Sequence, residues 1–113
     1  MGSGRHKIYL NYDDPITVVR IVEAIVSDVP RKERVINYSS ERPELLTSYI
    51  SINSAIYDAV AKFEPTLCRA IMNDIIDHVG YEKSGAAMYT SKGAYYRRKR
   101  MFIHDVAVAL NII

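Results

Sequence analysis

The chain has 113 residues, of which 49% are apolar and 25% are charged, and it contains a single cysteine. This length suits one domain with a modest core, and the composition excludes a disordered chain. The lone cysteine excludes an internal disulfide and favours a reducing compartment. No apolar run reaches the roughly 18 residues of a membrane span, so we expect a cytoplasmic protein without a membrane partner.

The formal net charge of +2 is unevenly distributed along the chain. Residues 65–113 carry seven cations and four anions, which leaves residues 1–64 with a net charge of −1. A positive field concentrated at one end is expected of a protein that meets a polyanion. The C-terminal half is therefore the first place to look for a binding surface.

We expect a mainly α fold, a small helical domain of four to five helices that ends in a helix-turn-helix. Residues 1–4 read as a cloning remnant, and residues 5–113 as a single domain. Within that domain, residues 5–64 form a scaffold and dimerisation half, and residues 65–113 form the helix-turn-helix half. Alternating apolar residues near the start predict a short N-terminal strand or an extended arm over residues 5–12.

The first helix is predicted to start at Asp13-Asp14-Pro15 and to run to about Val29, because Asp suits a cap and Pro suits the first turn. The polar run Pro30–Arg34 should end it. Residues 35–38 are then either a loop or a strand that pairs with the N-terminal arm in a small β-ribbon.

Residues 39–44 combine cap residues, a proline and early acids, which predict a second long helix that continues to Phe63. Asn53 falls in the apolar seam of this helix, and a polar residue in such a seam can fix the register of paired helices. The predicted homodimer interface comprises Tyr49, Asn53 and Ile56. A place for Asn53 at the partly exposed edge of the core is the alternative.

A third helix is predicted from Pro65, with Gly80 placed to end it. The stretch 82–88 has length for only two turns, and residues 89–91 form a tight connection to a long helix over residues 92–110. A short helix, a turn and a long helix are the outline of a helix-turn-helix.

The last helix has two distinct faces at 100° per residue. Its core stripe comprises Tyr95, Phe102, Val106, Ala109 and Leu110. The opposite face carries Gly93, Arg97, Arg100 and His104. Lys99 projects near the apolar arc, where its stem would reach outwards.

These positions predict a site for double-stranded DNA. Arg97 and Arg100 would read guanine edges, since arginine binds them in a bidentate way. Ser91 caps the helix and leaves amides for a phosphate, while Lys92 and Arg98 hold the DNA backbone. One of the two tyrosines is also predicted to contact the DNA backbone. Because Tyr95 is assigned to the core, Tyr96 is the residue expected to make this contact.

Catalytic and metal chemistry lack a recognisable pattern in the sequence. His78 follows Asp74 by one turn, but a surface or helix-cap role fits it better than a metal site because further ligands are missing. Cys68 reads as a small buried apolar residue. We therefore expect no enzyme activity, no cofactor, no metal and no small-molecule substrate.

The segment Ser91-Lys92-Gly93-Ala94-Tyr95-Tyr96-Arg97-Arg98-Lys99-Arg100-Met101-Phe102-Ile103, within residues 67–110, resembles the end of phage late transcriptional regulators of the ArpU/RinA type. In those proteins a similar Tyr-Tyr-Arg segment opens the recognition helix of a helix-turn-helix. The resemblance implies a DNA-binding activator of phage or mobile-element operons, with RNA polymerase as a further partner. The alternative is a small interaction module whose basic helix docks on an acidic protein surface.

Overall fold

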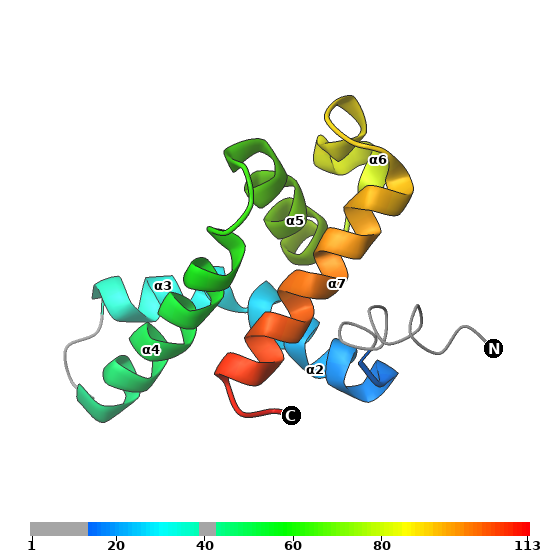
Figure 1. Ribbon diagram of the computed structural model, residues 1–113. Helices are drawn as coiled ribbons and strands as arrows, with labels where there is room; N and C mark the ends of the chain where they lie inside the picture. The colour runs from blue at the N-terminus through cyan, green and yellow to red at the C-terminus, as the bar shows by residue number, and fades with distance from the viewer. Residues whose placement is uncertain (1–13, 39–42) are drawn as a thin grey trace.

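The structure is a computed structural model, and it describes residues 14–38 and 43–113 (Figure 1). The described residues form helices joined by short turns and contain no strand, which confirms the predicted mainly α fold. Its elements are α2 (Ile16–Ser27), α3 (Val29–Tyr38), α4 (Pro43–Val60), α5 (Pro65–Asp77), α6 (Gly80–Ser84), the 3₁₀ turn η1 (Ala86–Met88) and α7 (Lys92–Ala109).

Two of the predicted helix starts are confirmed by local chemistry. Pro65 occupies the first helical position of α5. An amide hydrogen at this position would have no acceptor within the helix, so proline is tolerated there. Ser91 caps α7, and its hydroxyl accepts a hydrogen bond from the Ala94 amide at 3.3 Å. In α2 the residue before the helix is Pro15, and the helix begins at Ile16.

The largest departure from expectation is α3. The prediction of a polar break over residues 30–34, followed by a loop or strand to residue 38, is wrong because these residues are helical. Pro30 lies in the first turn, where proline is tolerated. Arg31 donates to both carboxylate oxygens of Asp28 at 2.7 and 2.6 Å, and the buried Lys32 donates to the Ile25 carbonyl at 3.1 Å. The polar run is therefore compatible with a helix, because two of its cations have partners at the end of α2.

This result also removes the strand partner of the N-terminal arm. A β-ribbon needs residues 35–38 as a strand, and they form the last turns of α3. The arm itself, residues 5–12, lies outside the described residues, as does the proposed remnant 1–4.

The end of α5 also differs from the prediction. His78 adopts the left-handed conformation (φ 55°) that closes α5, and Gly80 (φ 80°) begins α6. The sequence predicts Gly80 as the end of the helix, but the stop lies two residues earlier. The helix-cap role of His78 is confirmed.

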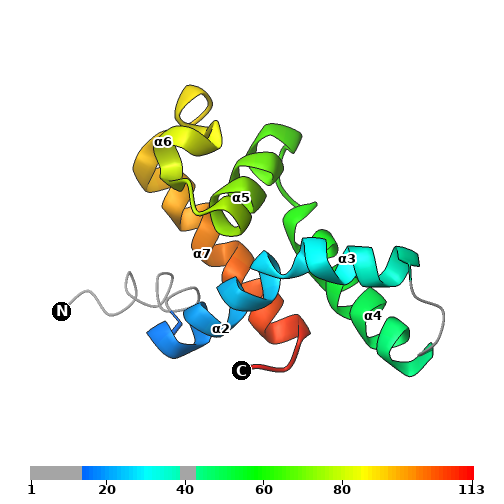
Figure 2. The same cartoon turned by 180° about the vertical axis from the view of Figure 1, so that it is seen from behind.

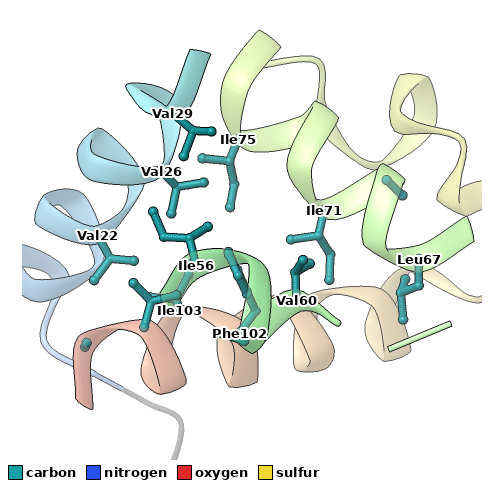
Figure 3. Close-up of a cluster of buried hydrophobic side chains, with 14 of the residues drawn as sticks. Val22, Val26, Val29, Ile56, Val60, Leu67, Ile71, Ile75, Phe102 and Ile103 are labelled. Carbon is teal, nitrogen blue, oxygen red and sulfur yellow. The ribbon is translucent and has the colours of Figure 1, made fainter. Parts of the chain in front are cut away.

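The core lies where α2, α5, α7 and the C-terminal half of α4 meet. Figure 3 shows aliphatic side chains from α2, α4 and α5 around Phe102 of α7, which is fully buried. Tyr95 and Val106 of α7 are fully buried as well, so the predicted core stripe of this helix is confirmed at its main positions. Ala109 is exposed and Leu110 is half-buried, because the stripe leaves the core at the last turn.

Helices α3 and α4 form a hairpin that extends to one side of this core (Figures 1 and 2). The C-terminal half of α4 packs against α7, whereas α3 packs mainly against α4. The far end of the hairpin lies away from α6 and from the N-terminal half of α7 (Figure 1).

Candidate nucleic-acid interface

The C-terminal half of the chain contains the predicted sequence of a short helix, a turn and a long helix. The short helix is broken in two, because Gly85 (φ 99°) ends α6 and η1 follows as a single 3₁₀ turn. Tyr81 of α6 closes the turn, since its hydroxyl donates to the Thr90 carbonyl at 2.5 Å. The ring of Tyr81 also packs against Tyr95 and Tyr96, with centroids 5.5 and 6.4 Å apart. The turn is thus held to α7 by side-chain contacts.

The outer face of α7 presents two arginines to solvent. Arg97 and Arg100 are exposed, and neither guanidinium has a hydrogen-bond or ion-pair partner among the described residues. Gly93, one turn before Arg97, is also exposed, and a β-carbon at this position would meet no atom within 4 Å. Two unpaired guanidinium groups therefore lie on one face with an unobstructed stretch of backbone before them.

Lys92 and Arg98 flank this face, each with a weak intramolecular contact. The Lys92 ammonium lies 3.7 Å from the Glu82 carboxylate, and both side chains are more than 60% exposed. Such an exposed pair contributes little energy, so a phosphate can compete for the lysine. Arg98 is half-buried and donates to the Ala94 carbonyl at 3.3 Å, beside a cavity lined by Phe63, Leu67 and Tyr89 among others.

His104 does not lie freely on the outer face as predicted. Its Nδ1 atom is 3.1 Å from a carboxylate oxygen of Asp14, just before α2, and its side chain is only 25% exposed. The second carboxylate oxygen of Asp14 is buried and has no hydrogen-bond partner among the described residues. His104 therefore helps to fix α7 to the start of α2, a contact that helical geometry within α7 alone does not reveal.

The largest surprise in the run of four cations is Lys99. Its ammonium lies 3.0 Å from the Asp74 carboxylate of α5 and 3.6 Å from the Glu23 carboxylate of α2, and its side chain is 15% exposed. It also lies 5.9 Å from the centre of the Tyr96 ring. The prediction that its stem reaches outwards is wrong, because acids of two other helices neutralise it inside the protein.

Asp74 is the centre of a buried polar cluster that joins α5, α6 and α7. Its carboxylate accepts hydrogen bonds from the Tyr95 hydroxyl at 2.5 Å, from Lys99 at 3.0 Å and from the Gly80 amide at 3.0 Å. Burial alone would raise the pKa of Asp74, but the hydrogen bonds from Tyr95 and Lys99 outweigh it and hold the pKa below its usual value. The carboxylate is therefore charged at neutral pH.

The same cluster fixes the protonation of Tyr95. Burial, followed by the hydrogen bond to Asp74, raises the pKa of Tyr95 well above its usual value, so the hydroxyl remains a donor. Tyr95 is fully buried, which agrees with its assignment to the core. Tyr96, the tyrosine predicted to contact DNA, is half-buried and packs edge-on against Tyr95, with ring centroids 5.2 Å apart. Part of its ring is therefore covered by the protein itself.

Sequence reasoning pairs Asp74 only with His78 and misses this cluster. The signal that could have revealed it is positional, since residue 74 lies on the same helical stripe as Leu67, Ile71 and Ile75. An acid within an apolar stripe indicates a buried carboxylate, and a buried carboxylate needs donors nearby.

Two of the three predicted dimer residues lie inside the single chain. Ile56 is fully buried in the core, and Asn53 is buried with its amide nitrogen 3.5 Å from the Val29 carbonyl. Their assignment to a dimer interface is wrong, because the contacts that they make are between α4 and its own neighbours. Tyr49 is half-buried, with the Arg31 guanidinium 5.4 Å from the centre of its ring.

Other chemical groups form no recognisable site in the described chain. No set of three histidine, cysteine or acidic side chains is arranged to hold a metal ion in residues 14–38 and 43–113. The Cys68 thiol is half-buried and lies 2.9 Å from the Val60 carbonyl. None of the described helices is both long and apolar enough to cross a membrane.

Comparisons with protein-family models, with curated proteins and with solved structures each give no match for this chain. The functional inference therefore depends on the chemistry of α7 and the elements that position it.

Proposed function

We propose that this chain is a sequence-specific double-stranded DNA-binding protein that regulates transcription, with α7 as the helix that enters the major groove. The observation that carries the proposal is the pair of exposed guanidinium groups of Arg97 and Arg100, which lie on one face of α7 and have no partner within residues 14–38 and 43–113. Arginine is the commonest side chain in specific contacts to guanine, and each bidentate contact contributes about 1–3 kcal/mol of discrimination.

The surroundings of this pair support a groove-reading role. The Ser91 cap and the exposed Lys92 lie at the start of α7, where amides and a cation suit a phosphate. The Tyr81–Tyr95–Tyr96 contacts and the Asp74 cluster hold α7 firmly against α5 and α6. A fixed helix keeps both guanidinium groups in register with base edges, which sequence reading requires.

The resemblance of residues 67–110 to ArpU/RinA-type regulators points the same way. On that basis we extend the proposal to the control of late phage or mobile-element genes, with RNA polymerase as the protein that the regulator would contact.

The test is a selection of duplexes from a random pool, followed by affinity measurements on the selected site as a function of salt. We expect affinity to fall steeply with salt, because lysine and arginine release counterions from the DNA. Arg97→Ala and Arg100→Ala should each relax the preference at one or two base pairs. Lys92→Ala should weaken all duplexes alike and lower the salt slope by about 1.

Arg20→Met supplies a control cation outside α7. Arg20 is exposed on α2, which packs against α7, and it takes no part in the Asp74 cluster, so its loss should leave the salt slope unchanged. If no duplex shows salt-sensitive binding even at low salt, the proposal is rejected. Salt-sensitive binding to an acidic protein, without binding to DNA, would instead establish the interaction-module alternative.

A further inference from the structure

The free end of the α3–α4 hairpin contains many apolar side chains that are exposed or only half-buried among the residues that the structure describes. We define this hairpin arm as residues 33–38 of α3 and 44–52 of α4. No residue in these two ranges is buried. Its large apolar and aromatic side chains are Val35, Ile36, Tyr38, Leu45, Leu46, Tyr49, Ile50 and Ile52. Tyr38 is 87% exposed and Ile50 is 47% exposed.

The arrangement of the helices explains why this surface is only partly covered. The arm extends beyond the core formed by α2, α5 and α7 (Figures 1 and 2), and α3 has α4 as its main packing partner. Helices as short as the ten residues of α3 owe their stability mainly to packing of an apolar face. Two helices alone bury only the stripe between them, so the arm lacks the further layer that its composition calls for.

We infer that a second copy of this chain covers the hairpin arm, so that two arms pack together in a homodimer. The charges on the arm favour a copy of itself over an acidic or a basic partner. Its charged residues are Glu33, Arg34 and Glu44, and Glu33 already accepts a hydrogen bond from Tyr57 at 2.8 Å. Arg34 and Glu44 are exposed and have no ion-pair partner among the described residues.

A twofold axis makes these two charges complementary. In an isologous dimer the same patch meets itself. In the arrangement that we propose, α3 of one copy lies against α4 of the other. The cation of α3 can then meet the anion that opens α4, twice per dimer. A strongly charged partner would gain little from an arm with this near balance.

The position of the arm leaves the rest of the molecule free to act. The end of the hairpin points away from the N-terminal half of α7 (Figure 1), so pairing of two arms leaves Arg97 and Arg100 uncovered. This inference concerns the arm alone and does not depend on DNA binding. It replaces Asn53 and Ile56 as dimer contacts with residues nearer the tip, and it retains Tyr49.

The test is sedimentation equilibrium of the full chain over a wide concentration range. We expect a monomer–dimer equilibrium that Ile50→Glu shifts by at least about a hundredfold in the dissociation constant, because each substitution places two buried charges in one interface. Leu46→Glu should act in the same direction. Val108→Glu is the matched control, since Val108 is 51% exposed but lies on α7, and it should leave the equilibrium unchanged.

A charge exchange tests whether the partner is a second copy in the proposed arrangement. Arg34→Glu alone should weaken the dimer several-fold, and Arg34→Glu combined with Glu44→Arg should restore it. Circular dichroism of each variant confirms that the helices are retained. A wild-type chain that stays monomeric at high concentration would overturn the inference, as would a dimer that survives Ile50→Glu and is lost in Val108→Glu.

Discussion

Replacement of Asp74 by asparagine should lower the stability of the protein by about 2–4 kcal/mol at neutral pH. The substitution keeps the shape of the side chain and removes its charge. In the native structure the carboxylate accepts three hydrogen bonds, and its side chain is only 7% exposed. Hydrogen bonds to a charged group contribute about 1.5–3 kcal/mol each, and removal of one partner of a buried ion pair costs about 3–5 kcal/mol.

The expected loss lies below the sum of these contributions for two reasons. The amide oxygen of asparagine can replace the carboxylate oxygen that accepts from Tyr95 and Lys99, although the amide nitrogen then faces the Gly80 amide, which donates to the other oxygen. Lys99 also keeps a second carboxylate, Glu23, at 3.6 Å, so its charge is not left without a partner. What is lost is the charge of the acceptor, the hydrogen bond from Gly80 and the shorter of the two ion pairs.

The pH dependence gives this prediction a distinctive sign. The folded state lowers the pKa of Asp74 below the ordinary 3.8, so the carboxylate contributes stability above that value and loses it as the pH falls through the folded pKa. Urea denaturation of wild type and Asp74→Asn should therefore give a constant difference from about pH 5 to 8 that shrinks in more acidic solution. A difference below about 1 kcal/mol at pH 7, or one that does not change with acid, would refute the role assigned to the charge.

Three further predictions follow from single side chains. Ser91→Ala should cost about 1 kcal/mol in urea denaturation, because it removes the cap of α7, whereas Ser91→Gly should cost only a few tenths; equal losses would contradict the capping role. Phe102→Ala should lower the free energy of unfolding by about 3–5 kcal/mol, since Phe102 is fully buried, whereas Met88→Ala should lower it by less than about 0.5 kcal/mol, since Met88 is 96% exposed. Comparable thermal shifts in the two variants would argue against this core. Lys32→Met should be neutral or stabilising, because burial lowers the pKa of Lys32. The folded state therefore loses the lysine proton at a lower pH than the unfolded state, so the stability of wild type relative to this variant should rise as the pH rises toward 10.5. A steady loss of relative stability over that range would contradict the buried charge.

The sequence predicts best what single helices determine. Pro65 and Ser91 mark real helix starts, and the spacing of Tyr95, Phe102 and Val106 identifies the buried side of α7. Each of these signals depends on residues within one turn or one stripe. Local geometry and the 3.6-residue period are sufficient for them.

The failures concern residues whose role depends on a distant partner. Lys99 and Arg100 are neighbours with the same charge, and only the acids of α2 and α5 explain why Lys99 is inside and Arg100 outside. A helical wheel of α7 alone places His104 on the outer face. The contact that holds His104 against the protein is with Asp14, which lies outside α7 and so does not enter such a wheel. The helix α3 escapes prediction for the same reason, since the partners of its polar run, Asp28 and the Ile25 carbonyl, lie at the end of α2.

The continuity of α4 has a mechanical consequence. This single helix of 18 residues passes from the core beside α7 to the end of the hairpin arm, without a break. At 1.5 Å per residue it is about 27 Å long, so a rotation of about 5° at its core end displaces its far end by about 2 Å. A helix of this kind acts as a lever, and any tilt of α7 that α4 follows is enlarged at the arm. The surface that would bind DNA and the surface that would bind a second copy are thus connected through α4, which contacts α7 near one end and forms part of the arm at the other.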